Sequence, residues 1–191
     1  MSEDFRRLAL DRIRERDHAI APPPNEIVKL PSPWFTVRPG PVQILVLHAM
    51  GEWVARDDGF QHCTDLLYNL GLSVHALCLP DGRIVECVAA ENVAYHAGPH
   101  NATSVGMEIV VAGAHNLDSL YERIADVDNP PFRPAQYESA GWWFRKQANR
   151  FDLDFSAIKT HAELDPQRKR DPGAAFDLEA FRLAFDNART G

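Results

Sequence analysis

The sequence has no long apolar run and few cysteines. No stretch approaches the roughly 20 apolar residues that a membrane helix needs, so no membrane span is expected. The three cysteines, Cys63, Cys78 and Cys87, form no C-x-x-C pair, which argues against disulfides and thiolate zinc sites and predicts buried thiols. The mixed, charged N-terminus lacks the apolar core of a secretory signal peptide. A cytoplasmic protein is therefore expected.

An excess of basic charge is missing as well. Against 27 Asp and Glu there are 20 Lys and Arg, which gives a formal net charge of −7. Binding to a phosphate backbone needs a basic surface, so no nucleic-acid partner is expected. What is present is the composition of an ordinary globular domain, with 45% hydrophobic and 25% charged residues. A chain of 191 residues has room for one well-packed domain.

The N-terminal part differs from the rest in composition. Residues 4–17 carry apolar side chains at helical spacing among many charges and predict a short amphipathic helix. An Ala-Pro-Pro-Pro stretch ending at Pro24 then predicts a stiff linker. We therefore divide the chain into residues 1–26, a helix with its linker, and residues 27–191, the main domain. Residues 27–41 contain several prolines and predict an irregular arm with a short edge strand.

The hydrophobic pattern of the main domain predicts an α/β (α+β) fold, with a central mixed sheet of about five strands covered by helices. The Asp81-Gly82 dipeptide favours a type I′ hairpin turn between two apolar runs. Residues 112–134 read as a long loop, a possible flap near a site. The expected strands are residues 43–48, a hairpin over residues 73–88, residues 105–111 and residues 157–160, and the expected helices are residues 59–70, residues 135–151 and the segment after Asp177.

Polar side chains interrupt three of the expected strands. His48 ends the strand over residues 43–48, and on its own such a histidine is usually structural. Glu108 lies in the middle of the apolar run 105–111, where a carboxylate is costly unless it faces a partner or a cleft. His75 lies inside a strand and is expected to be a hydrogen-bonded core histidine.

Residues 159–173 combine an imidazole, acids, basic groups and two prolines without an apolar period, so we expect a surface loop. Loops on a rigid scaffold often carry the chemistry of a protein. His161 and Asp171 could each give a metal ion one ligand. Lys169 precedes Asp171 by two residues, so in an extended segment its ammonium group points the same way. A solvated, charged loop is the alternative for these residues alone.

Taken in order, these segments resemble the zinc-dependent N-acetylmuramoyl-L-alanine amidases of the amidase type 2 family, which share their fold with the peptidoglycan recognition proteins. The resemblance runs from about Ile44 to Gly173 and keeps the order of the family's motifs. The matching pieces are Leu45-Val-Leu-His48, Ser73-Val-His-Ala-Leu with Asp81-Gly82-Arg83, Tyr95-His-Ala-Gly98, Ser104-Val-Gly-Met-Glu108, and His161 followed by Asp165-Pro166, Arg168-Lys169 and Asp171-Pro172-Gly173.

The resemblance implies a zinc site at one edge of the sheet, with His48, His161 and Asp171 as ligands and an open position for water. It implies that Glu108 is the general base and that Lys169 stabilises the oxyanion. The bond cut would join N-acetylmuramic acid to L-alanine of the peptidoglycan stem peptide.

Substrate contacts are less defined by the resemblance. Tyr95, His96 and Arg168 could line the sugar or peptide groove, or they could have structural roles. An aspartate as third ligand resembles bacterial enzymes of cell-wall turnover and recycling, and related prophage lysins that would be released towards the cell wall. Intact sacculi and soluble anhydro-muropeptides both stay open as substrates, and so does the oligomeric state. The alternative function is a module of the same fold that binds muropeptides without hydrolysing them.

Overall fold

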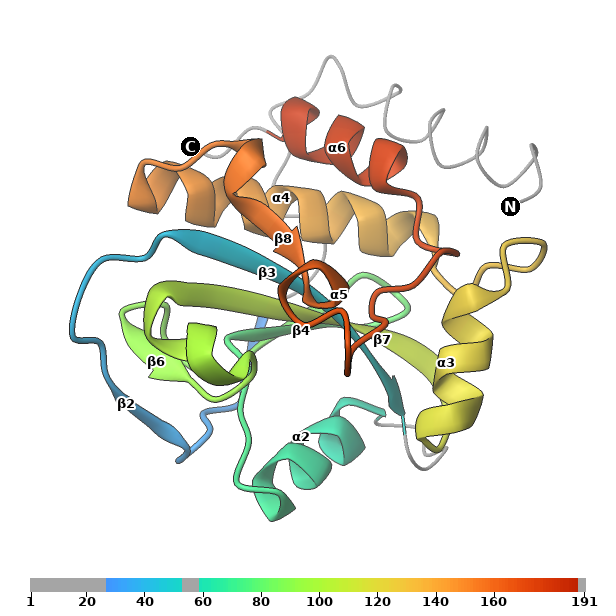
Figure 1. Ribbon diagram of the computed structural model, residues 1–191, viewed down its shortest axis with the longest axis horizontal. Coiled ribbons are helices and arrows are strands. Elements are labelled where there is room, and N and C mark those ends of the chain that lie inside the picture. The colour runs from blue at the N-terminus through green and yellow to red at the C-terminus, as the bar shows by residue number, and fades with distance from the viewer. Residues whose placement is uncertain (1–26, 53–58, 189–191) are drawn as a thin grey trace.

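The computed structural model of the protein describes residues 27–52 and 59–188. The expected helix over residues 4–17 and the proline-rich linker lie outside the described residues. The division of the chain at residue 26 therefore stays a prediction. The described residues form one mixed α/β domain in which helices pack on a central sheet (Figure 1).

Six strands form the central sheet, in the order β1-β5-β4-β7-β3-β8. Among these strands β4 and β5 pair antiparallel, and the other neighbouring pairs are parallel. A separate antiparallel ribbon pairs β2 with β6. The mixed sheet is thus confirmed, with one strand more than expected. The bounds are β1 Ile27–Lys29, β2 Phe35–Val37, β3 Ile44–Glu52, β4 Ala76–Cys78, β5 Ile84–Glu86, β6 Asn92–Ala94, β7 Ser104–Ala114 and β8 Ile158–Thr160.

The two longest strands, β3 and β7, lie side by side at the centre of the sheet. Their aliphatic runs suit strands that are covered on both faces. Because side chains alternate along a strand, Leu45 and Leu47 of β3 point into the larger hydrophobic core together with Met107 and Ile109 of β7. The alternate residues of these strands, including His48 and Glu108, point to the opposite face. One face of the sheet is therefore covered by the larger core, and the other carries both the polar residues and a smaller apolar core.

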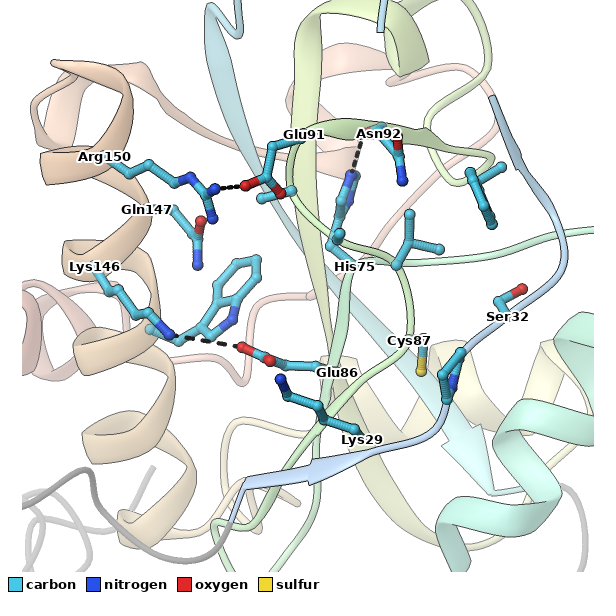
Figure 2. Close-up of a pocket in the computed structure, with 16 residues that line it drawn as sticks. Lys29, Ser32, His75, Glu86, Cys87, Glu91, Asn92, Lys146, Gln147 and Arg150 are labelled. Atoms are coloured by element: carbon cyan, nitrogen blue, oxygen red, sulfur yellow. Dashed lines mark hydrogen bonds and ion pairs between the residues drawn. The ribbon is translucent and has the colours of Figure 1, made fainter. Parts of the chain in front are cut away.

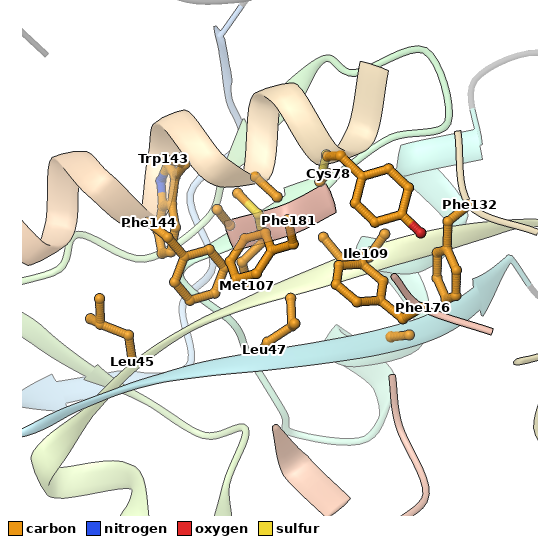
Figure 3. Close-up of a cluster of buried hydrophobic side chains, with 14 of the residues drawn as sticks. Leu45, Leu47, Cys78, Met107, Ile109, Phe132, Trp143, Phe144, Phe176 and Phe181 are labelled. Atoms are coloured by element: carbon orange, nitrogen blue, oxygen red, sulfur yellow. The ribbon is translucent and has the colours of Figure 1, made fainter. Parts of the chain in front are cut away.

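Helices α4 (Pro134–Phe151) and α6 (Leu178–Asn187) cover the apolar face (Figure 1). Between helices and sheet lies a cluster of aromatic rings (Figure 3), in which Phe181 is 5.4 Å from Phe144 and 5.8 Å from Phe176 between ring centroids. Helix α6 begins as expected at Asp177, whose carboxylate accepts hydrogen bonds from the backbone of Glu179 and Ala180. Both predicted helices are confirmed.

Helix α2 (Gly59–Asn69) lies on the other side of the sheet (Figure 1). Cys63 is buried there in a second, smaller core with Leu77 and Val110, and Leu66 packs against it. Gly71 follows the helix with a φ of 66°, a left-handed conformation in which a glycine meets no steric cost. The predicted helix over residues 59–70 and its glycine end are confirmed.

The hairpin of β4 and β5 is confirmed, but its turn differs from the expected type I′. The amide of Gly82 donates to the carbonyl of Leu79 at 2.9 Å, so Pro80 and Asp81 occupy the central positions. Of the turn residues, Gly82 alone has a positive φ, of 86°. A type I′ turn needs two such residues, whereas a three-residue loop that ends in a left-handed glycine needs one. Pro80 at the first central position favours the observed turn.

The expected long loop over residues 112–134 is wrong, because it contains the helix α3 (Leu117–Ala125). Asn116 starts this helix with a capping box, in which its side chain accepts from the Ser119 amide and the Ser119 side chain accepts from the Asn116 amide. Only Leu120 and Ile124 of this helix are buried, so the apolar pattern is too sparse to be seen in the sequence. The shorter described helices are the 3₁₀ turns Gly98–Thr103 and Phe155–Ala157 and the α5 helix His161–Leu164.

Other expectations from composition agree with the described residues. Cys63, Cys78 and Cys87 are buried thiols that form no disulfide among the described residues, as expected. Among the described residues, none of the helices has the length and apolar character to cross a membrane.

Packing of α4 on α6 leads to a prediction about Gly141. A Cβ atom added at Gly141 would lie 2.6 Å from the carbonyl carbon of Ala184 and 2.7 Å from the amide nitrogen of Phe185. In a free helix Gly→Ala stabilises by about 1 kcal/mol, but here overpacking should destabilise the protein by about 1–3 kcal/mol. Urea unfolding of Gly141→Ala measures this difference. Gly40→Ala is the control, since a Cβ at Gly40 meets nothing within 4 Å; equal stability of both variants would contradict the close helix contact.

Candidate metal centre

Three neighbouring parallel strands bring polar side chains to one face of the sheet. His48 lies in β3, and its partner across the β3–β7 ladder is Glu108. On its other edge β3 pairs with β8, where Thr160 lies opposite Leu47. His161 follows Thr160 directly, so it comes level with His48. The register of the sheet therefore places two imidazoles and a carboxylate together.

The segment from residue 159 to residue 173 is only partly the expected surface loop. It begins in β8 and continues as α5. A capping box starts this helix, in which the side chains of Thr160 and Glu163 each accept a hydrogen bond from the backbone amide of the other. An exposed turn follows over residues 166–168. The chain then returns, and the backbone carbonyl of Asp171 accepts a hydrogen bond from the amide of Ala162 at 3.0 Å. As a result, Asp171 is buried rather than solvated.

His48, His161 and Asp171 converge on one point. The Nδ1 atoms of the two histidines are 2.8 Å apart. Oδ2 of Asp171 is 3.1 Å from Nδ1 of His161 and 3.4 Å from Nδ1 of His48. Tetrahedral zinc with bonds of about 2.0–2.1 Å holds neighbouring ligand atoms about 3.3 Å apart. The three side chains that are the predicted ligands thus lie together, at a spacing that fits such an ion.

The donor atoms of this cluster also suit a cation chemically. Burial lowers the pKa of His48, so its imidazole is neutral and offers a lone pair. Burial alone would raise the pKa of Asp171, but the polar contacts of its carboxylate with His161 and His48 outweigh burial and lower this pKa, so the carboxylate is charged. Two neutral imidazoles and one carboxylate leave a divalent cation with net positive charge, the set that catalytic zinc sites use.

Glu108 lies beside this cluster with an unsatisfied oxygen. Its Oε1 is 4.0 Å from Nδ1 of His48. Oε2 is buried and has no hydrogen-bond partner among the described residues. Burial and the negative charge of Asp171 raise the pKa of Glu108 to about 8, against an opposing effect of Lys169. A carboxyl group with a pKa near neutrality is suited to take up and release a proton.

Lys169 is half-buried and its charge acts on the cluster. Its positive charge lowers the pKa of Glu108 and of His48, so it acts electrostatically on both. Its neighbour Arg168 points away into solvent, with 69% of its side chain exposed, and forms an ion pair with Asp165. The structure therefore brings Lys169 to the site and leaves Arg168 at its rim.

The other two residues predicted to contact substrate, Tyr95 and His96, are both held by contacts within the protein. Tyr95 is half-buried, and its backbone pairs with Ser73. His96 has protein partners at both ring nitrogens: Nδ1 is 2.8 Å from Nε2 of His48, and Nε2 is 3.2 Å from Oγ of Ser104. Its role as a substrate contact stays a prediction, and the ring has no nitrogen left for a ligand in this arrangement.

Helix α3 braces the segment that carries Lys169 and Asp171. The hydroxyl of Tyr121 donates to the backbone carbonyl of Arg168 at 3.2 Å. The amide of Ala175 donates to the carbonyl of Ile124 at 2.9 Å. Gly173, with a φ of 86°, lies so close that a Cβ atom there would be 2.3 Å from the Ile124 oxygen. The expected flap near the site is thus a helix that holds the site's loop.

Sequence reasoning overlooked two residues of the site, Ser104 and Gly106. Both belong to the segment Ser104-Val-Gly-Met-Glu108 that was singled out for Glu108. Ser104 is within hydrogen-bond distance of the His96 ring. The backbone of Gly106 lies close to the His96 and His48 rings. A glycine inside an apolar strand is the signal that marks a close approach.

A cavity of about 430 Å³ lies at the edge of the sheet, between α4, the arm after β1 and the β5–β6 connection (Figure 2). Four of its charged side chains form ion pairs, Lys146 with Glu86 and Arg150 with Glu91. None of the metal-binding cluster lines it. His75 lines it and is, as predicted, a hydrogen-bonded core histidine, which accepts from the Gly106 amide at 3.0 Å and donates to the Asn92 carbonyl at 3.2 Å.

Fold and cluster together define a class of protein. A mixed sheet carries a buried His-His-Asp cluster at one face, a carboxyl group of raised pKa beside it and a lysine within electrostatic reach. Such an arrangement is typical of metal-dependent hydrolases.

Comparison with known families identifies the class. The sequence profile of the amidase type 2 family, described as N-acetylmuramoyl-L-alanine amidase, matches residues 38–174. The chain belongs to this family and is an N-acetylmuramoyl-L-alanine amidase, which confirms the resemblance drawn from the motifs. The matched segment contains all eight residues predicted for the site.

Two curated relatives carry the name 1,6-anhydro-N-acetylmuramyl-L-alanine amidase AmpD. The enzyme of Enterobacter cloacae is 29% identical over 121 residues, which cover 59% of this chain and 57% of that protein. The enzyme of Salmonella typhimurium is 28% identical over 175 residues, or 82% of this chain and 89% of that protein.

Solved structures support the fold. A crystal structure of an AmpD derivative aligns with a TM-score of 0.63 and 23% identity over 87% of this chain and 99% of that one. The amidase AmiD from E. coli, in complex with anhydro-N-acetylmuramic acid-L-Ala-D-γ-Glu-L-Lys, aligns with a TM-score of 0.55 and 25% identity over 75% of this chain and 57% of that one.

The buried histidines lead to a prediction about pH and stability. Burial lowers the pKa of His75 from 6.5 to about 3. Between these values the unfolded chain binds a proton that the folded protein does not, so stability is full above about pH 6.5 and is lost as the pH falls. From His75 alone, the free energy of unfolding should fall by about 2 kcal/mol between pH 7.5 and pH 5.

Urea unfolding of chelator-treated protein at these two pH values measures the effect. His75→Asn keeps an acceptor for the Gly106 amide but does not titrate, so its loss of stability should be smaller by about 2 kcal/mol. An unchanged pH dependence in this variant would show that His75 does not stay neutral in the folded protein.

Proposed function

We propose that this protein is a zinc-dependent amidase that hydrolyses the bond between N-acetylmuramic acid and the L-alanine of a stem peptide. The observation that carries the proposal is the convergence of His48, His161 and Asp171 within 3.4 Å of one another, with Glu108 beside them. The two Nδ1 atoms and the Asp171 carboxylate would hold the ion. Zinc in such a site supplies Lewis acidity and makes water a nucleophile near neutral pH.

Glu108 is proposed as the group that moves the proton. Its unpartnered Oε2 would accept a proton from the attacking water, whose oxygen bonds to the lactyl carbonyl carbon. Glu108 would then pass this proton to the nitrogen of L-alanine as the C–N bond breaks. The products are a free carboxyl group on the muramyl part and a peptide with a free amino terminus. No covalent intermediate with the protein is needed.

Lys169 is proposed to stabilise the negative charge that develops on the carbonyl oxygen. It is half-buried and its charge already acts on Glu108, so it can act on the reacting carbonyl at the same place. Such interactions are stronger away from bulk water and contribute about 10²–10³-fold to the rate.

The substrate is proposed to be a soluble muropeptide with a 1,6-anhydro sugar. The names of the curated relatives support this choice, and the AmiD structure holds an anhydro-muramyl tripeptide. Aspartate as the third ligand is compatible with this choice, although it resembles prophage lysins as well as enzymes of cell-wall turnover and recycling. Cytoplasmic localisation stays a prediction that agrees with a soluble substrate.

Hydrolysis of anhydro-N-acetylmuramyl-L-Ala-D-γ-Glu-L-Lys tests the proposal. Zinc-loaded protein should release the tripeptide, detected by mass spectrometry, and a chelator should abolish the release. Glu108→Gln should lower kcat by about 10²–10⁴-fold because the proton acceptor is lost, while zinc content stays unchanged. Lys169→Met should lower it by about 10²–10³-fold.

Glu122→Gln is the matched control, because Glu122 is an exposed residue of α3. It should leave kcat unchanged. A wild-type protein that binds zinc and substrate without releasing peptide would overturn the enzyme and favour a muropeptide-binding module. Equal release from intact sacculi would overturn the preference for soluble substrate.

A further inference from the structure

His96 lies directly behind the metal ligand His48. It follows β6 in the chain, and its ring meets the His48 ring at 4.9 Å between centroids and at 81° between planes. Nδ1 of His96 is 2.8 Å from Nε2 of His48, and the other nitrogen is 3.2 Å from Oγ of Ser104. The three side chains form one chain of hydrogen bonds that leads away from the metal centre.

The direction of these hydrogen bonds follows from the chemistry of neutral imidazole. Nδ1 of His48 faces His161 and Asp171, so it must be free of hydrogen to bind a metal. The hydrogen of His48 is then on Nε2, which donates to His96. His96 must therefore accept at Nδ1 and carry its own hydrogen on Nε2, which donates to Ser104.

The backbone around His96 is held in place independently of its ring. The amides of His96 and Ala97 both donate to Oδ1 of Asn101, at 3.0 Å and 2.6 Å. The backbone that carries the His96 ring is therefore held without help from the ring itself.

Gly106 makes room for this arrangement. A Cβ atom at Gly106 would lie 2.5 Å from Cε1 of His96 and 3.2 Å from Nε2 of His48. Its amide donates to Nδ1 of His75, which keeps this part of β7 in place. A glycine is needed at this position of Ser104-Val-Gly-Met-Glu108 because a side chain there would collide with the hydrogen-bonded rings of His96 and His48.

We propose that His96 is a positioning residue that holds His48 with Nδ1 free for the metal, and that it does not bind substrate. The proposal rests on the metal centre of the proposed function. A histidine ligand of a metal usually donates its second N–H to a protein acceptor, and loss of that acceptor typically costs 10–100-fold in metal affinity or activity. Here the acceptor is another imidazole whose own tautomer Ser104 fixes.

Two variants of the same shape separate the hydrogen bond from packing. His96→Asn keeps an acceptor, because Oδ1 of asparagine is bonded to Cγ as Nδ1 of histidine is. His96→Leu has the same branched skeleton and no acceptor. Zinc affinity, measured by competition with a chromophoric chelator, should fall about 10–100-fold in His96→Leu and stay within about threefold of wild type in His96→Asn. Circular dichroism of the metal-free proteins controls for folding.

Ser104→Ala is a second test that leaves the His96 ring in place. Removing the hydroxyl leaves both tautomers of His96 available, so zinc affinity should fall by about threefold to tenfold. This variant decides the matter if His96→Leu does not fold.

Several outcomes would overturn the proposal. Equal zinc affinity in His96→Leu and His96→Asn, whether high or low, would show that the acceptor is not what matters. Unchanged zinc affinity with a raised KM at saturating zinc would show that His96 contacts substrate instead. The proposed amidase reaction can fail separately from this proposal. That would be the result if the zinc affinities of wild type, His96→Asn and His96→Leu follow the predicted order and the wild-type protein still releases no peptide.

Discussion

The parallel pairing of β3 with β7 on one side and β8 on the other is the constraint on which the rest of the structure depends. In this register His48 lies opposite Glu108, and His161 follows the residue that pairs with Leu47. A slip of one residue would turn His48 to the opposite, apolar face, because side chains alternate along a strand. The leucines and Met107 on that face, packed against α4, thus fix the register and with it the site.

Burial of so many polar groups is costly, and their mutual contacts offset the cost. Asp171 lies within hydrogen-bond distance of His161, His48 of His96, and His96 of Ser104. Glu108 keeps one buried oxygen without a hydrogen-bond partner among the described residues, as the proposed role in proton transfer requires. Helix α3 adds a brace to the returning segment, so the site is held by the sheet on one side and by a helix on the other.

The sequence predicts those parts of the fold that have a strong local signal. The long apolar runs of β3 and β7, the Asp81-Gly82 hairpin and the ordered motifs around His48, His161 and Asp171 belong to them. Within residues 27–41 one short edge strand is expected and two are found, β1 and β2. Like β6 they have three residues each, too few for a period, and no turn dipeptide such as Asp81-Gly82 marks them. Helix α3 buries two side chains, and the contact of His96 with His48 depends on a loop that closes only in three dimensions, so neither leaves a pattern in the sequence.

Diffraction at the zinc absorption edge from crystals of zinc-loaded protein would locate the metal. One anomalous peak is expected about 2.0–2.2 Å from Nδ1 of His48, Nδ1 of His161 and an oxygen of Asp171. The peak should lie on the Glu108 side of the sheet and have no sulfur ligand. A peak at another place, or no peak in protein that contains stoichiometric zinc, would show that these three residues are not the zinc ligands.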